Sequence, residues 1–155
     1  MKKGILLSAF LLAAIPTTHA QGTGGQPAGC HIGNLGEQPA AAQKAMSSFL
    51  RGLQSQVAQG HKSQVADMIA YPLHAWISGK NQNVQSKREF LQLYDQIFTK
   101  PLTKLLPEQR PACISRVGAQ GFSISRGEIW FDIHSDGSVK IFNVTPVVMS
   151  DEYRP

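Results

Sequence analysis

A long apolar stripe in the first half of the chain limits the fold more than any other feature. Across residues 39–60 apolar side chains recur every three or four positions, the spacing that gathers them on one face of a helix. The members of the stripe are Ala42, Met46, Phe49, Leu50, Leu53 and Val57. We therefore predict a helix that begins near Pro39, ends at Gly60 and turns its apolar face to the core.

The middle of the chain predicts a short helix, a strand hairpin and another helix. Residues 61–70 keep the helical spacing of apolar side chains. Pro72 disfavours helix at the residue before it, and residues 73–77 then alternate between apolar and polar side chains, as a strand does. Ser86 and Glu89 form a capping-box pattern, which places the start of the next helix at Ser86.

The last third of the chain is rich in predicted strands. Residues 112–118, 122–133 and 138–148 form three strand-like segments, and Asp136-Gly137 is a strong signal for a hairpin between the last two. In that hairpin we expect one face to hold Ile129, Phe131 and Ile133 against Val139, Ile141 and Asn143.

Helices followed by a run of antiparallel strands define an α+β fold class. We predict N-terminal helices packed on a curved antiparallel sheet, in one domain of residues 39–155. Residues 21–38 are rich in glycine and lack apolar periodicity, so they are predicted to form an irregular N-terminal arm.

Residues 1–20 have the pattern of a secretory signal peptide. Lys2 and Lys3 precede an apolar run over residues 5–15, and small residues lead to a cleavage position near Ala20. The run is too short to span a bilayer. We therefore expect a periplasmic or secreted protein without membrane insertion.

The charge of the chain argues against a nucleic-acid partner. The formal net charge is +5, and it falls to +3 once the two lysines of the signal segment are removed. The remaining basic residues are scattered along the sequence. Nucleic-acid binders instead gather lysine and arginine into a patch or stripe.

The two cysteines, Cys30 and Cys113, both follow the signal segment. An even pair in an exported chain is most simply a disulfide, which would fasten the N-terminal arm to the domain. A redox or metal-binding pair is the weaker alternative, because only the adjacent His31 offers a further ligand near either cysteine.

The histidines after the signal segment do not have the spacing of a metal site. None forms an i, i+4 pair on a predicted helix, and they do not cluster in sequence. These histidines are His31, His61, His74 and His134. We predict no metal site and no cofactor.

Several segments together resemble the nuclear transport factor 2-like superfamily of cystatin-like cones. They are YPLHAW (71–76), EFLQLYDQIF (89–98), and the GEIWFDI and KIFNV strands of the closing hairpin. The resemblance implies a curved sheet wrapped around a long helix, and it makes a homodimer formed through the sheet an expectation. Within the superfamily the chain is similar to small exported bacterial proteins of unassigned role.

Tyr94 and Asp95 are the first candidate site residues. Asp95 is predicted just beyond the edge of an apolar helix arc centred on Tyr94. Such a carboxylate either pairs with a basic group or a backbone amide and docks the helix, or faces a cavity as a general base. In the second case Tyr71, Tyr94 or His74 would donate hydrogen bonds. The resemblance allows this, since isomerases and dehydratases of the superfamily place acids, tyrosines and histidines inside the cone.

Trp76 and Trp130 are each predicted on a strand face shared with polar neighbours. Aromatic side chains in that setting are typical anchors for a ligand or partner. The alternative is that helices cover this face and both tryptophans belong to the core.

These observations predict an exported binding protein. It would take a small apolar ligand in the cone or a periplasmic partner protein on the sheet, as an inhibitor or immunity protein does. The candidate ligand-binding residues are Tyr71, His74, Trp76, Tyr94, Asp95 and Trp130. The alternative function is a cofactor-independent isomerase or dehydratase that uses Asp95 as base.

Overall fold

The computed structural model describes residues 30, 32–124 and 127–145, and it has an α+β fold. The predicted signal peptide lies outside the described residues. Six strands form one sheet in the order β2-β1-β6-β5-β4-β3. The strands are β1 (Ile69–Ile77), β2 (Lys80–Val84), β3 (Ser115–Arg116), β4 (Phe122–Ile124), β5 (Ile129–Ile133) and β6 (Val139–Val144).

The sheet is mixed, which corrects the prediction of an antiparallel one. Four neighbouring pairs are antiparallel, but β1 and β6 run parallel. Parallel neighbours need a long crossover connection rather than a hairpin. Here the helices and strands between β1 and β6 form that connection, so the order of local elements along the chain did not reveal the pairing.

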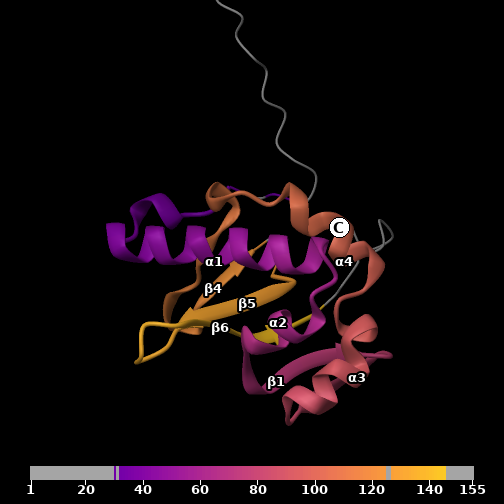
Figure 1. The fold of residues 1–155 in the computed structure, drawn as a ribbon. Coiled ribbons are helices and arrows are strands. Elements are labelled where there is room, and N and C mark those ends of the chain that lie inside the picture. The colour runs from indigo at the N-terminus through magenta and orange to yellow at the C-terminus, as the bar shows by residue number, and fades with distance from the viewer. Residues whose placement is uncertain (1–29, 31, 125–126, 146–155) are drawn as a thin grey trace, which may run out of the picture.

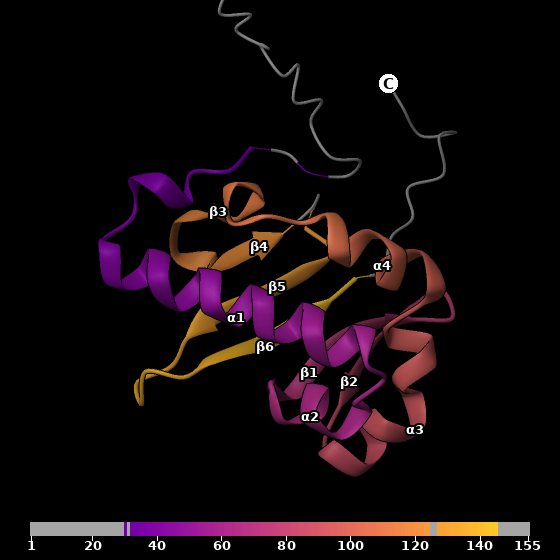
Figure 2. The same cartoon turned by 45° about the horizontal axis from the view of Figure 1, so that its top comes forward.

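The described helices lie on one face of the sheet, which we call the inner face (Figures 1 and 2). The longest helix, α1, crosses β4, β5 and β6, while α2 and α3 lie beside β1. The helices are α1 (Ala40–Ala58), α2 (Lys62–Asp67), α3 (Lys87–Ile97) and α4 (Lys100–Leu105). The opposite, outer face of the sheet has no described helix on it.

The two long helices begin where their sequence signals predicted. Helix α1 follows Pro39 and ends before Gly60, whose positive φ of 69° closes the helix. Helix α3 follows Ser86, whose hydroxyl accepts from the Glu89 amide at 3.3 Å, while the Glu89 carboxylate accepts from the Gln85 amide at 2.7 Å. This arrangement is a capping box in which the Glu89 carboxylate accepts from the amide of Gln85 instead of that of the N-cap residue, Ser86.

The short helix α2 is shorter than predicted. It ends at Asp67, and Ile69 already belongs to β1. The reason is tertiary, because the Ile141 amide of β6 donates to the Met68 carbonyl at 2.9 Å and Ile69 pairs with Ile141. Sheet pairing therefore overrides the helical spacing of residues 61–70.

Two of the segments predicted as single strands in the last third of the chain are interrupted by turns in the structure. Residues 122–133 form two strands, β4 and β5, with Gly127 at a φ of 93° in the turn before β5. Within residues 112–118 only Ser115–Arg116 is strand, because single 3-10 turns flank it at Pro111–Cys113 and Gly118–Gln120.

The closing hairpin forms at Asp136-Gly137 as predicted, but Asn143 is on the other face from the one expected. The register between β5 and β6 shifts, since Phe131 pairs with Ile141 whereas Trp130 pairs with Asn143. Such a bulge reverses the alternation of side chains beyond it. Val144 is therefore the buried residue, and Asn143 lies on the outer face.

The N-terminal arm is fastened to the domain as the cysteine pair predicted. Cys30 and Cys113 form a disulfide. Beyond it, the Gly33 amide donates to the Ala112 carbonyl at 2.7 Å and the Leu35 amide donates to the Ile114 carbonyl at 3.2 Å. The backbones approach so closely that a Cβ at Gly33 would lie 2.0 Å from the Ile114 carbonyl oxygen, so only glycine fits there.

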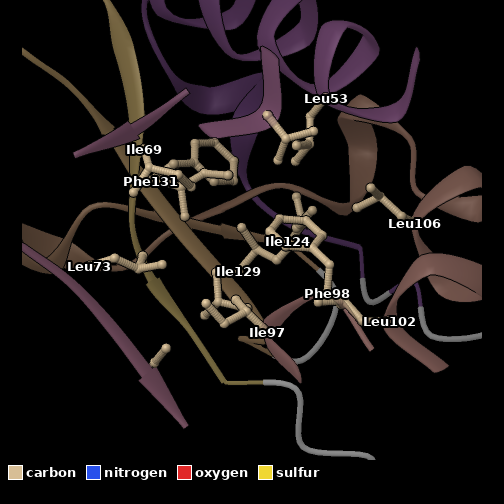
Figure 3. Close-up of a cluster of buried hydrophobic side chains, with 14 of the residues drawn as sticks. Leu53, Ile69, Leu73, Ile97, Phe98, Leu102, Leu106, Ile124, Ile129 and Phe131 are labelled. Carbon is tan, nitrogen blue, oxygen red and sulfur yellow. The ribbon is translucent and has the colours of Figure 1, made fainter. Parts of the chain in front are cut away.

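Apolar side chains from the helices and the inner face of the sheet fill the space between them (Figure 3). Phe131 of β5 lies near the centre, with its ring centroid 4.9 Å from that of Phe49 on α1. Among the described residues, the buried polar side chains are those of Gln109 and Ser123. None of the described helices is long and apolar enough to cross a membrane.

Candidate functional site

Asp95 lies on the surface and pairs with a lysine of the neighbouring helix. Both of its carboxylate oxygens accept from Lys62 Nζ of α2 at 2.8 Å, and its side chain is 81% exposed. The same ammonium group lies 4.9 Å from the centroid of the Tyr94 ring, within the range of a cation–π contact. The predicted pairing of Asp95 with a basic group is confirmed by this ion pair.

Replacing Asp95 by asparagine should have a small effect on stability. The pair is exposed, so we expect the free energy of unfolding to fall by less than about 1 kcal/mol, and by less still at high salt. Urea denaturation of Asp95→Asn, Lys62→Met and the double variant measures the coupling between the two side chains. A loss of several kcal/mol, or one that is independent of Lys62, would contradict the assignment.

Tyr71 and Tyr94 belong to the packed layer between α3 and the sheet. The Tyr71 hydroxyl donates to the Ala66 carbonyl at 3.1 Å, and the Tyr94 ring stacks on Phe98 with centroids 5.2 Å apart. Burial, with the charge of Asp67 added, raises the pKa of Tyr71 to about 12. Burial and then Asp95 raise the pKa of Tyr94 as well. Both phenols therefore stay neutral over the physiological range.

His74 is separated from the two tyrosines by the sheet. It alternates along β1 with the buried side chains of Leu73 and Ala75, so it points to the outer face and is exposed. The residues that an Asp95-based mechanism requires thus lie in different places, with Asp95 in a surface ion pair and His74 on the opposite side of the sheet from Tyr94.

The outer face instead brings together a continuous row of uncharged side chains, which we call the outer row. Strand register places one member on each of the six strands, and directly opposite residues share a face. In sheet order the outer row is Asn83, His74, Asn143, Trp130, Ser123 and Ser115. It contains two of the predicted site residues, His74 and Trp130, and it crosses the whole sheet from β2 to β3.

Trp76 extends this surface by one step along β1. It is on the same face as His74, is 39% exposed, and has Asn81 of β2 directly opposite. Trp130 is half-buried, with its indole N–H donating to the Gly127 carbonyl at 2.8 Å and its ring against Gly127. Neither tryptophan lies beneath a described helix. The alternative prediction, in which helices cover this face and both tryptophans belong to the core, is therefore wrong.

Several polar side chains around Trp76 keep their hydrogen-bonding capacity. The side chains of His74, Asn81 and Asn83 make no hydrogen bond with the part of the chain that the structure describes. Asn143 uses its carbonyl oxygen, which accepts from the Thr145 hydroxyl at 3.1 Å. Donors and acceptors are therefore available to a ligand on both sides of His74.

The charged groups at the border of this surface are largely engaged. Arg116 donates to the Asp132 carboxylate at 3.2 Å, and Lys140 Nζ donates to the Asp67 carbonyl at 2.6 Å. Glu128 lies two residues before Trp130, near the other end of the surface. The outer row itself carries no formal charge when its histidine is neutral.

Sequence reasoning identified His74, Trp76 and Trp130 but missed the asparagines between and beside them. Asn81 and Asn83 alternate on β2, the second strand of the predicted hairpin, whose residues were not considered for the site, and Asn143 was expected on the face of Ile129 and Phe131. The alternation of Asn81 and Asn83 is a signal that could have found two of the three.

No cluster of metal-ligating side chains occurs within the described ranges. Comparison of the chain with protein-family models, curated proteins and solved structures finds no match. The function is therefore argued from the chemistry of the outer face.

Proposed function

We propose that the protein is an exported binding protein whose binding surface is the outer face of the sheet around Trp76. The observation that carries the proposal is an exposed indole beside a row of uncharged polar side chains, on a face free of described helices. Indole side chains are among the strongest contributors to binding energy in interfaces. A rigid sheet holds these groups in place before the ligand arrives, which lowers the entropic cost of binding.

The location outside the cytoplasm is part of the proposal. Its support is the Cys30–Cys113 disulfide, since disulfides persist in oxidising compartments. The signal-peptide pattern of residues 1–20 supports it from the sequence. Membership of the nuclear transport factor 2-like superfamily also stays a proposal, supported by a long helix lying across one face of the sheet.

A ligand inside the cone and an Asp95-based enzyme are less favoured by the geometry. The inner face is lined by buried apolar side chains from both layers, which occupy the space that such a ligand would need. Asp95 is exposed and bound to Lys62, and His74 faces the other way. The outer face brings His74, Trp76 and Trp130 together with polar side chains that are not packed into the core.

Replacing Trp76 by alanine should abolish most binding while the fold is retained. Loss of a central indole costs about 2 kcal/mol or more, which is roughly a 30-fold loss of affinity. The mature, oxidised protein is immobilised and exposed to an extract of the source cells, and retained proteins and glycans are identified by mass spectrometry. Molecules retained by the parent protein should be lost from Trp76→Ala.

Leu91→Ala is the matched control for this experiment. Leu91 is 37% exposed on α3, close to the 39% of Trp76, but it lies on the helical side of the molecule. This variant should retain the same molecules as the parent. If both variants retain them equally, or if Leu91→Ala alone loses them, the outer face is not the binding surface.

A further inference from the structure

We propose that the outer face binds a neutral, β-linked chain of pyranose sugars. This inference rests on the proposed function, because it names the ligand class of the same surface. Exposed indole rings present a negative π face. The flat face of a pyranose ring presents C–H groups of slight positive charge, and its rim carries hydroxyl groups.

The hydrogen-bonding groups next to Trp76 suit the rim of such a sugar. His74, Asn81 and Asn83 keep both donors and acceptors free of other described residues. The Asn143 carbonyl oxygen is taken by Thr145, which leaves its NH₂ group to donate. Sugar hydroxyls both donate and accept, so they can satisfy amide and imidazole groups without a charged partner.

The charge pattern favours a neutral sugar over an acidic one. Arg116 and Lys140, the cations nearest the outer row on β3 and β6, already donate to Asp132 and to the Asp67 carbonyl. An anionic polysaccharide would find no lysine or arginine in the outer row itself to pair with its charges. A neutral ligand avoids the cost of leaving its own charges unpaired.

The spacing of the two indoles favours a chain over a single sugar. Trp76 is on β1 and Trp130 is on β5, with β6 between them, so the strands that carry them are about 10 Å apart at the ordinary strand spacing. A ligand that contacts both rings must extend over at least two consecutive sugars. Chains with β-1,4 linkages between equatorial positions are flat ribbons, which match a sheet surface better than the coiled α-linked chains do.

The test uses the tryptophans as the reporter, because Trp76 and Trp130 are the two tryptophans of the chain and both lie on this face. Cellohexaose and the hexamer of β-1,4-linked N-acetylglucosamine are titrated into the mature, oxidised protein, with maltohexaose as the α-linked control. Fluorescence and calorimetry follow binding. We expect a saturable change with at least one β-linked hexamer and a weaker response to maltohexaose.

Variants locate the binding and keep the proposal falsifiable. Trp76→Ala should weaken binding at least tenfold, and Asn81→Ala about threefold, whereas Leu91→Ala should bind like the parent. The sugar proposal is wrong if neither β-linked hexamer gives a saturable response. It is also wrong if a hexamer binds and Trp76→Ala leaves that binding unchanged.

The two proposals fail separately. If the hexamers do not bind but a protein is retained from the cell extract in a Trp76-dependent manner, the ligand class is wrong and the outer face is still the binding surface. If neither the binding of the hexamers nor the retention of any component of the extract depends on Trp76, both proposals are wrong.

Discussion

The variant with Cys30→Ser and Cys113→Ser is expected to lose about 4 kcal/mol of the free energy of unfolding. The disulfide joins residues 83 apart in sequence, and in the chain-entropy model a crosslink over so long a loop stabilises the folded state mainly by restricting the unfolded chain. Domains of this size are stable by roughly 5–15 kcal/mol in total. The loss is therefore a large part of the whole, and urea denaturation of oxidised parent and variant measures it.

Reduction of the parent protein is the control for this prediction. Reduced parent and double-serine variant should have similar stability, because both lack the crosslink. Hydrogen exchange should also speed up at the Gly33 and Leu35 amides, which bond to the carbonyls on either side of Cys113. A variant as stable as the oxidised parent would mean that the arm is held by its backbone pairing and not by the disulfide.

Phe131→Ala is expected to lower the free energy of unfolding by about 3–5 kcal/mol, the usual cost of removing a fully buried ring. Phe131 has no exposed surface. Its ring lies between Phe49 of α1 and Phe122 of β4, at centroid distances of 4.9 Å and 6.3 Å. Removing it leaves a cavity where the long helix meets the sheet, and chemical denaturation measures the cost.

Ile133→Ala is the matched control, since Ile133 is on the same strand and two residues further on. It alternates onto the same side of β5 but is 39% exposed at the end of the strand. We expect its loss to cost less than about 1 kcal/mol. Equal losses for the two variants would show that the core does not centre on Phe131.

Local signals in the sequence were enough for the two long helices and the closing turn. The Ser86 cap, the Gly60 stop and the Asp136-Gly137 loop each depend on neighbouring residues, so the sequence carries them directly. The disulfide was predictable from cysteine count and compartment. None of these required knowledge of which strands pair.

The outer face could not be predicted in the same way, because it exists only through strand register. Asn143 reaches this face because of a bulge, and it meets His74 because β1 and β6 are parallel. Neither fact is visible in the alternation of a single segment. The sequence predicted that both tryptophans share a strand face with polar residues. It could not predict that the helices cover the opposite face, because this depends on the arrangement of the whole sheet.

The sheet cannot be completed before β6 has been synthesised, because β1 pairs with β6. Ile69 lies beside Ile141, nearly half the chain length away. Contacts so distant in sequence raise the contact order and slow folding. Until β6 is present, β1 and β2 pair only with each other and pack on α3, without the strand that connects them to β5, β4 and β3. The order of synthesis thus keeps β1 and β2 separate from β5, β4 and β3 until β6 joins the two parts of the sheet.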